Sequence, residues 1–209
     1  MAQVKTFDYQ TFDPWQRLRE IGMFFQSKDP VHQALRRLIR RLDKARIAYA
    51  VMGAMAVNLH GARRTTDDVD ILLTGADLER FRQEIVPKYY SPIVGRTRRF
   101  RERKSGILLD VLVTGKFPGS GKPGPFAFPD PARACEEIKN IKVITLPHLI
   151  QLELAARRYY DFGDVVHLIR VHNLDEAFLK KIHPSVKQDF IECLEEKRRE
   201  DEYETQEEA

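Results

Sequence analysis

The sequence is poor in cysteine and has no long apolar run. Its 209 residues include two cysteines, Cys135 and Cys193, which lie far apart. They offer neither a disulfide framework nor the paired spacing of a zinc site, so both are read as ordinary thiols. No apolar run approaches the ~20 residues of a membrane span, and no charged-then-apolar leader opens the chain. These absences predict a soluble, cytoplasmic protein with no membrane partner.

The composition is otherwise that of a folded, basic protein. Apolar residues make up 43% of the chain, enough for a core, and the length predicts one domain with a helical extension. The net charge of +4 conceals an asymmetry, because residues 195–209 hold three basic and eight acidic side chains and so carry −5, against +9 elsewhere. A basic body suits a polyanion, either a nucleoside triphosphate or RNA.

Residues 49–73 hold the pattern on which the functional interpretation depends. An apolar β-type run breaks at Gly53, a short apolar helix follows, and a second β-type run carries Asp68 and Asp70. Side chains two apart on a strand share a face, so both carboxylates project together. They repel each other unless a cation lies between them, and the pair therefore predicts a divalent metal site.

A third carboxylate lies on a later apolar run, residues 106–113. Asp110 interrupts this run, and packing alone does not explain it, because an unpaired ion in a core is strongly disfavoured. We therefore expect Asp110 to join Asp68 and Asp70.

The order of these motifs is similar to that of a known superfamily. A glycine after a first strand, Asp-x-Asp on a second and a later strand Asp resemble the DNA polymerase β-type nucleotidyltransferases. More narrowly, the chain resembles the small bacterial nucleotidyltransferases grouped with AbiEii-type toxins and the minimal nucleotidyltransferases. The resemblance covers roughly residues 29–171 and is carried by Ala54, Ala56, Val57, His60, Gly61, Arg64, Thr66, Asp68 and Asp70, and by the segments Phe117–Pro123, Phe128–Pro131, Leu146–Ile150 and Asp161–Val165.

The resemblance implies an α/β (α+β) fold: a mixed β-sheet flanked by helices, with a helical C-terminal portion. It implies that the three aspartates bind two Mg²⁺ or Mn²⁺ ions and that the chain transfers a nucleoside monophosphate from a triphosphate such as ATP. The acceptor would be a tRNA 3′ end, another RNA or a protein hydroxyl, and the partner an antitoxin. The nucleotide contacts would be Gly53, Ala54, Arg64 and Thr66.

Two departures favour an alternative, a nucleotide-binding or RNA-binding regulatory module without turnover. Ala54 lacks the hydroxyl that relatives place there, and Glu153 stands where relatives usually carry a lysine that contacts the nucleotide. A carboxylate at 153 repels a triphosphate unless it pairs with Arg157 or Arg158 or binds a metal ion. Arg157 is also a candidate for a phosphate or acceptor contact. A pure interaction partner in a two-gene module is a third hypothesis.

Several other residues keep two interpretations each. His60 fits a helix-end histidine or a site residue, and Asp161 fits a helix N-cap or a ligand. The stretch 96–104 holds six basic residues, so Arg99 and Arg101 fit a solvated edge strand or a groove for phosphate. Residues 114–131 are a glycine- and proline-rich loop, a flap or an ordered surface loop, from which Lys122 could reach phosphate.

Four segments are predicted along the chain. Residues 1–28 form an N-terminal extension and 29–145 the nucleotidyltransferase core, which opens with Asp29 as the N-cap of a helix. Residues 146–196 form the helical C-terminal portion, with one helix over 147–160 and another opened by Asp161. Residues 197–209 are almost wholly charged, which predicts disorder.

Overall fold

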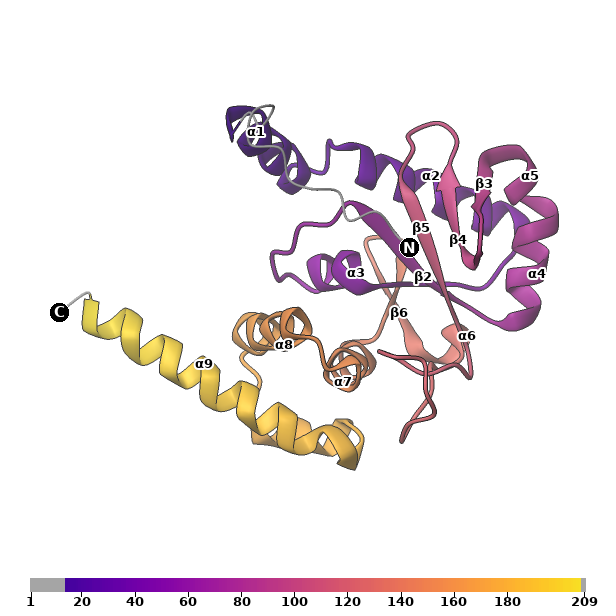
Figure 1. Ribbon diagram of the computed structural model, residues 1–209. Helices are drawn as coiled ribbons and strands as arrows, with labels where there is room; N and C mark the ends of the chain where they lie inside the picture. Colours follow the sequence, from indigo (N-terminus) through magenta and orange to yellow (C-terminus); the bar gives the residue numbers. More distant parts are fainter. Residues whose placement is uncertain (1–13, 208–209) are drawn as a thin grey trace.

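A computed structural model describes residues 14–207 of the chain, and it has the predicted mixed α/β architecture (Figure 1). The sheet has seven strands in the order β3-β4-β5-β2-β1-β7-β6. Strand β2 runs parallel to β5 and antiparallel to β1, so the sheet is mixed. The strands are β1 Ala50–Met52, β2 Asp68–Leu73, β3 Tyr90–Ile93, β4 Arg96–Glu102, β5 Leu108–Val113, β6 Cys135–Ile138 and β7 Ile141–Ile144.

Helices pack on the sheet and on one another. Helices α2 and α4 contact strands β2 and β5, while α3, α7, α8 and α9 follow one another in contact. The helices are α1 Pro14–Phe25, α2 Pro30–Ala45, α3 Gly53–Leu59, α4 Gly75–Glu84, α5 Val86–Tyr89, α6 Pro131–Ala134, α7 Leu146–Ala156, α8 Tyr159–His172 and α9 Lys187–Glu207, with 3₁₀ turns η1 Glu176–Lys181 and η2 Pro184–Val186. None of the helices within residues 14–207 has both the length and the apolar content of a membrane span.

Helix α2 begins where the sequence predicts. The Asp29 side chain accepts hydrogen bonds from the backbone N–H groups of Val31 and His32, which would otherwise lack partners at the helix start. The apolar stripe of α2 is buried against the sheet. Its polar side is not wholly solvated, because Arg37 and Arg41 donate to the buried carboxylate of Glu102 on β4 over 2.5–2.9 Å.

The C-terminal helices differ from the prediction at three points. The helix expected over 147–160 ends at Ala156, because Arg157 adopts the left-handed conformation (φ 56°). Helix α8 then begins with Arg158 at the N-cap position, so Asp161 lies in its first turn and the N-cap interpretation of Asp161 is wrong. Within the predicted helical portion 146–196, the segment Glu176–Lys181 is the 3₁₀ turn η1 and not an α-helix.

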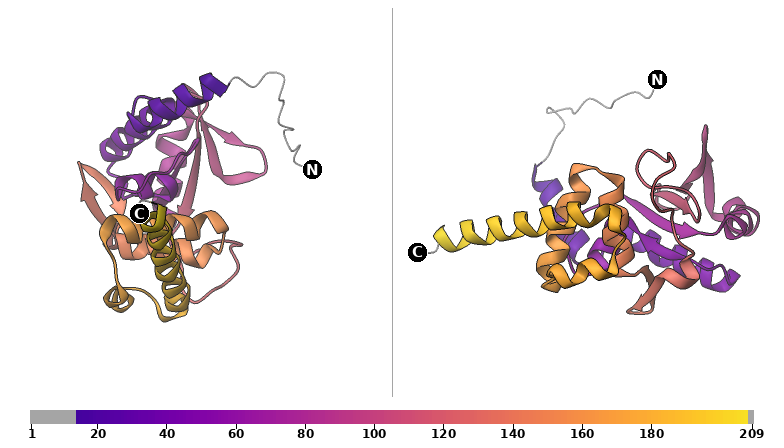
Figure 2. Two further views of the ribbon diagram at one scale, coloured as in Figure 1. Left: turned by 90° about the vertical axis from the view of Figure 1, so that its left-hand side faces the viewer. Right: turned by 90° about the horizontal axis from the view of Figure 1, so that it is seen from below.

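The two ends of the described chain are helical. Disorder was predicted from residue 197, whereas α9 continues to Glu207 and extends away from the body (Figure 2). Arg170 of α8 pairs with Glu200 and Asp201, and Lys197 pairs with Asp201 one turn on, so part of the charge is compensated. At the other end, α1 forms part of the predicted extension 1–28. Residues 1–13 of that extension lie outside the described part of the chain.

Candidate active site

Three residues of the predicted site lie in one row across neighbouring strands. Asp70 on β2 pairs in register with Asp110 on β5, and Asp110 pairs in register with Arg99 on β4. Asp68 precedes Asp70 by two positions, and the alternating burial of β2 places both on the half-buried face, opposite the buried Val69. The strand pairing therefore brings together the three aspartates that the sequence separates by up to 42 positions.

Arg99 lies between two of these carboxylates. Its Nη2 is 3.6 Å from Asp68 Oδ2 and its Nε is 3.2 Å from Asp110 Oδ1. The other oxygen of Asp68 accepts a 2.6 Å hydrogen bond from Thr66 Oγ1, which fixes the side chain. A single cationic group thus bridges Asp68 and Asp110.

Gly53 leaves room for Asp70. Its φ of 57° is in the left-handed region that favours glycine, and it occupies the turn between β1 and α3. A Cβ at this position would lie 3.1 Å from Asp70 Cγ and would overlap Oδ2. Gly53 is therefore needed both for the turn and for the position of the Asp70 carboxylate.

The site carries an excess of negative charge. Burial, with the Asp68 and Asp110 charges, raises the pKa of Asp70 from 3.8 to about 7. Burial also raises the pKa of Asp110, and Asp68 adds to that effect while Arg99 opposes it. Ionised forms of these carboxylates are therefore disfavoured until positive charge is added.

This donor set fits a divalent cation. Carboxylate oxygens are the ligands that Mg²⁺ and Mn²⁺ prefer, and Asp68 and Asp110 already share one cationic group, the Arg99 guanidinium. The oxygens of Asp68, Asp70 and Asp110 are nonetheless spread more widely than a compact set of metal ligands. Among residues 14–207, the acidic group whose ligand atoms all lie within 4.8 Å of one another is a different one, Glu153, Asp161 and Asp164.

A cavity of about 760 Å³ opens beside this row. Asp70 and Asp110 line it, together with Gly53 and the arginines at 96, 98, 99 and 158. Residues 117–121 of the glycine- and proline-rich loop close one side, and Gly119 lies so near the end of α7 that a Cβ there would be 3.0 Å from Ala156 O. The cavity thus combines carboxylates with cations, as a site for a metal-bound phosphate ester requires.

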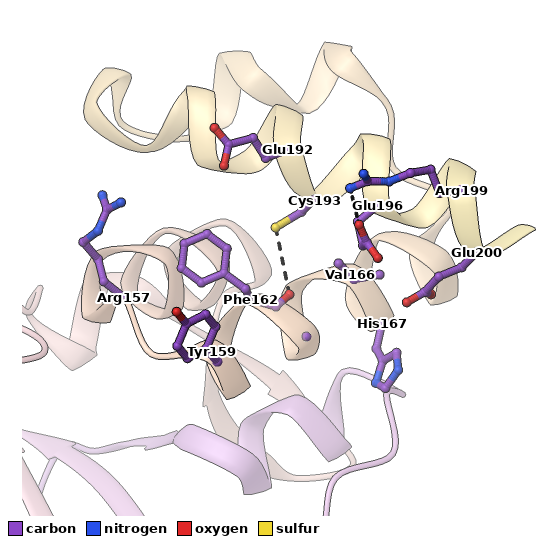
Figure 3. A pocket seen from close by; sticks show the side chains of 11 residues that line it. Arg157, Tyr159, Phe162, Val166, His167, Glu192, Cys193, Glu196, Arg199 and Glu200 are labelled. Atoms are coloured by element: carbon purple, nitrogen blue, oxygen red, sulfur yellow. Dashed lines mark hydrogen bonds and ion pairs between the residues drawn. The ribbon is translucent and has the colours of Figure 1, made fainter.

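Four predicted contacts lie elsewhere. Arg64 does not continue the face of β2, because β2 begins at Asp68; its Nε is 3.7 Å from Asp164 Oδ2. Arg101 donates to the carbonyl oxygen of Gly106, and the exposed Lys122 is not among the residues that line the cavity. Arg157 pairs with Asp189 and lines a separate pocket between α8 and α9 (Figure 3).

The residues with two interpretations are now placed. His60 is buried and its Nε2 is 2.8 Å from the Ile144 carbonyl oxygen, which agrees with a helix-end histidine bound to a strand. Glu153 is buried and lines the cavity, and Asp161 pairs with Arg158. Ala54 lies in the first turn of α3, which has seven residues, and its role in phosphate binding stays a prediction.

Arg158 lines the cavity, whereas the sequence named it only as a possible ion-pair partner of Glu153. It is the N-cap residue of α8, at a break that the helix predicted over 147–160 does not contain. The available signal was the charge of Glu153, which needs a nearby cation. Arg99 was predicted to lie on a solvated edge strand or to contact phosphate, and its pairing with two predicted metal ligands was not foreseen.

No family model matches the sequence, and no curated protein matches it. Solved structures are similar in fold. The lincomycin-bound lincosamide adenylyltransferase LnuA has a TM-score of 0.47 at 14% identity, with 66% of this chain and 96% of that chain covered. ANT(2")-Ia in complex with adenylyl-2"-tobramycin has a TM-score of 0.45 at 13% identity, covering 71% and 97%. An antigenic nucleotidyltransferase-like protein from Paracoccidioides brasiliensis has a TM-score of 0.42 at 14% identity, covering 73% and 88%.

Proposed function

We propose that this protein is a metal-dependent nucleotidyltransferase that moves a nucleoside monophosphate from a triphosphate to an acceptor hydroxyl. The observation that carries the proposal is the row of Asp70, Asp110 and Arg99 across three strands at the wall of a 760 Å³ cavity, with Asp68 tied to it through Arg99. Asp68, Asp70 and Asp110 would hold the metal. When bound, a divalent ion neutralises phosphate charge and lowers the pKa of a coordinated hydroxyl.

In the proposed reaction, residues of the chain bind the triphosphate, orient the acceptor hydroxyl and accept its proton. The acceptor oxygen attacks the α-phosphorus, the bond from that phosphorus to the bridging oxygen breaks, and pyrophosphate leaves with the electron pair. Asp110, at the cavity wall beside Asp70, takes up the hydroxyl proton. The arginines of β4 at the cavity wall offset charge on the leaving pyrophosphate.

The acceptor is proposed to be RNA, with a tRNA 3′ end as the first candidate. Arg96 and Arg98 are exposed and line the cavity, so a polyanion could approach the site along β4. A protein hydroxyl is the second candidate. A toxin role with a cognate antitoxin, and action in the cytoplasm, extend the proposal and follow from the resemblance of the motifs alone.

Labelled nucleotide transfer tests the proposal. The protein is incubated with each labelled triphosphate, Mg²⁺ or Mn²⁺, and either total RNA or cell protein. We expect label in one acceptor class, and loss of transfer by at least ~100-fold in Asp68→Asn, in line with the loss of a transition-state contact. Asp67→Asn is the matched control, because Asp67 is the exposed neighbour of Asp68. Absence of label with every nucleotide and acceptor, or equal activity of the two variants, would refute it.

The alternative function, a nucleotide-binding or RNA-binding regulatory module without turnover, predicts a different result with the same protein. Glu153 at the cavity wall favours it, because this position lacks the nucleotide-contacting lysine that the resemblance implies. Calorimetry with triphosphate and Mg²⁺ distinguishes the two. Tight binding with no product supports the module, and product formation supports the enzyme.

A further inference from the structure

Glu153 places a buried acidic group at the wall of the cavity. Its ligand atom and those of Asp161 and Asp164 all lie within 4.8 Å of one another, and the three residues are 3–8% exposed. Three ionised carboxylates in so small a buried volume would repel one another and any bound phosphate. A triphosphate can bind in this cavity only if cations on this side compensate for the cluster.

Two arginines face this cluster from different directions. Arg64 Nε lies 3.7 Å from Asp164, and the Arg64 guanidinium lies over the ring of Tyr160 at 5.2 Å. Arg158 Nε donates a 2.7 Å hydrogen bond to Asp161 Oδ2. Of the two, Arg158 is the one that also lines the cavity with Asp70 and Gly53.

The turn between α7 and α8 directs two consecutive arginines into different pockets. Arg157 ends α7 with a positive φ, and its guanidinium pairs with Asp189 beside the pocket between α8 and α9 (Figure 3). Arg158 is the N-cap residue of α8 and lines the cavity that contains Asp70. Both side chains are 69% exposed, so the two arginines differ in direction and not in solvent access.

The Arg158 guanidinium is held at one nitrogen. Its Nε is bound to Asp161, whose side chain is 4% exposed, and no other hydrogen bond of the Arg158 side chain is found within the described part of the chain. A tethered guanidinium whose outer nitrogens remain available matches the planar, bidentate geometry that phosphate oxygens accept. Its charge also reaches Asp70, since it opposes the rise that burial causes in the pKa of that carboxyl.

We propose that Arg158 binds the triphosphate of the nucleotide, and that Asp161 positions its guanidinium for this contact. The inference rests on the proposed function, because it assigns the anion-binding group of the same cavity. Arg158 thus supplies, from the turn before α8, positive charge at the wall of the cavity that Glu153 also lines. Glu153 then has a structural role: burial and the adjacent Asp161 carboxylate raise the pKa of Glu153 well above 4.5, which disfavours a negative charge on its side chain.

Nucleotide binding measured without turnover tests the inference. The full chain is titrated by calorimetry with a non-hydrolysable triphosphate and with the matching monophosphate, each with Mg²⁺. Arg158→Gln should weaken triphosphate binding by ~10- to 100-fold, the range for a lost charged hydrogen bond, and monophosphate binding by less than ~3-fold. Arg157→Gln, the equally exposed neighbour, should leave both unchanged. Equal loss in both variants, or no change in the ratio of the two affinities for Arg158→Gln, would overturn the inference.

Two further variants test the positioning. Asp161→Asn should reduce triphosphate selectivity in the same direction as Arg158→Gln, because the tether becomes neutral. Glu153→Gln should keep triphosphate affinity within ~3-fold, since the amide has nearly the same shape and Glu153 has no phosphate contact in this assignment. A large loss in Glu153→Gln with none in Asp161→Asn would contradict the assigned roles. Thermal unfolding of each variant verifies that it is folded.

The outcomes distinguish this inference from the proposed function. If the wild-type chain binds no triphosphate and transfers no label, both fail. If it binds triphosphate and transfers label while Arg158→Gln binds as well as wild type, only the inference fails, and the arginines of β4 are then the anion-binding groups.

Discussion

Gly53→Ala should disable the carboxylate site while leaving the fold largely intact. The variant places a Cβ at a φ of 57°, which costs about 1–2 kcal/mol in the left-handed region. The new Cβ would also lie 3.1 Å from Asp70 Cγ and overlap Oδ2. Asp70 can relieve that overlap by rotating, because its carboxylate is the end of a side chain, but it then leaves its place beside Asp110. The steric cost should therefore affect ligand geometry more than stability.

Two measurements on matched variants separate these effects. Gly106 also has a positive φ (77°), but a Cβ there would have no atom within 4 Å, so Gly106→Ala carries the backbone strain alone. Both variants should lose about 1–2 kcal/mol, or roughly 2–8 °C in Tm. Mn²⁺ affinity, followed by calorimetry or electron paramagnetic resonance, should fall at least about 10-fold in Gly53→Ala and stay at the wild-type level in Gly106→Ala. Wild-type Mn²⁺ affinity in Gly53→Ala would refute the reasoning.

Three further predictions concern charge. Arg99→Gln should raise Mn²⁺ affinity by roughly 5- to 10-fold in a calorimetric titration, because the ion no longer competes with two ion pairs; weaker binding would contradict this. The folded-state pKa of Asp70 is raised to about 7, so its contribution to stability is present below pH 3.8 and lost as the pH rises through 7. In thermal unfolding, the stability advantage of Asp70→Asn over metal-free wild type should therefore grow by about 1–3 kcal/mol from pH 5 to pH 8. An advantage that stays constant over this range would refute the reasoning. Glu102→Ala should cost about 3–5 kcal/mol in urea unfolding, because it leaves two arginines of α2 unpaired, whereas the exposed Glu84→Ala should cost under about 1 kcal/mol.

The sequence predicted the parts of this fold that local periodicity determines. The alternation at Asp68 and Asp70, the glycine break and the Asp29 cap each depend on a few neighbouring residues, and the structure has all three. The order of the strands cannot be predicted from neighbouring residues alone. The pairing of Asp110 with Asp70, for example, follows from the parallel pairing of β5 with β2. That proximity was expected from the chemistry of Asp110, an otherwise unexplained aspartate in an apolar run.

Other features could not be predicted because a single backbone angle or a long-range pair decides them. Arg157 turns the chain at φ 56°, and no glycine or proline marks the turn in the sequence. The short strands β3 and β6 are defined by their partners, and neither was predicted. Residues 197–207 looked too charged to be ordered, but they continue α9, and Arg170 on the neighbouring helix compensates part of their charge.

The cavity has two acidic groups with opposite requirements, and this difference assigns their roles. Asp70 and Asp110 line an open cavity, and Asp110 pairs with Arg99, whose side chain is 36% exposed and can be displaced. Glu153, Asp161 and Asp164 are buried, and arginines face them at 2.7 and 3.7 Å. A metal that entered the buried group would have to release Arg158 from Asp161, whereas a metal at the open group releases only Arg99. The open trio is therefore the less costly metal site, and the buried trio is better suited to positioning a cation.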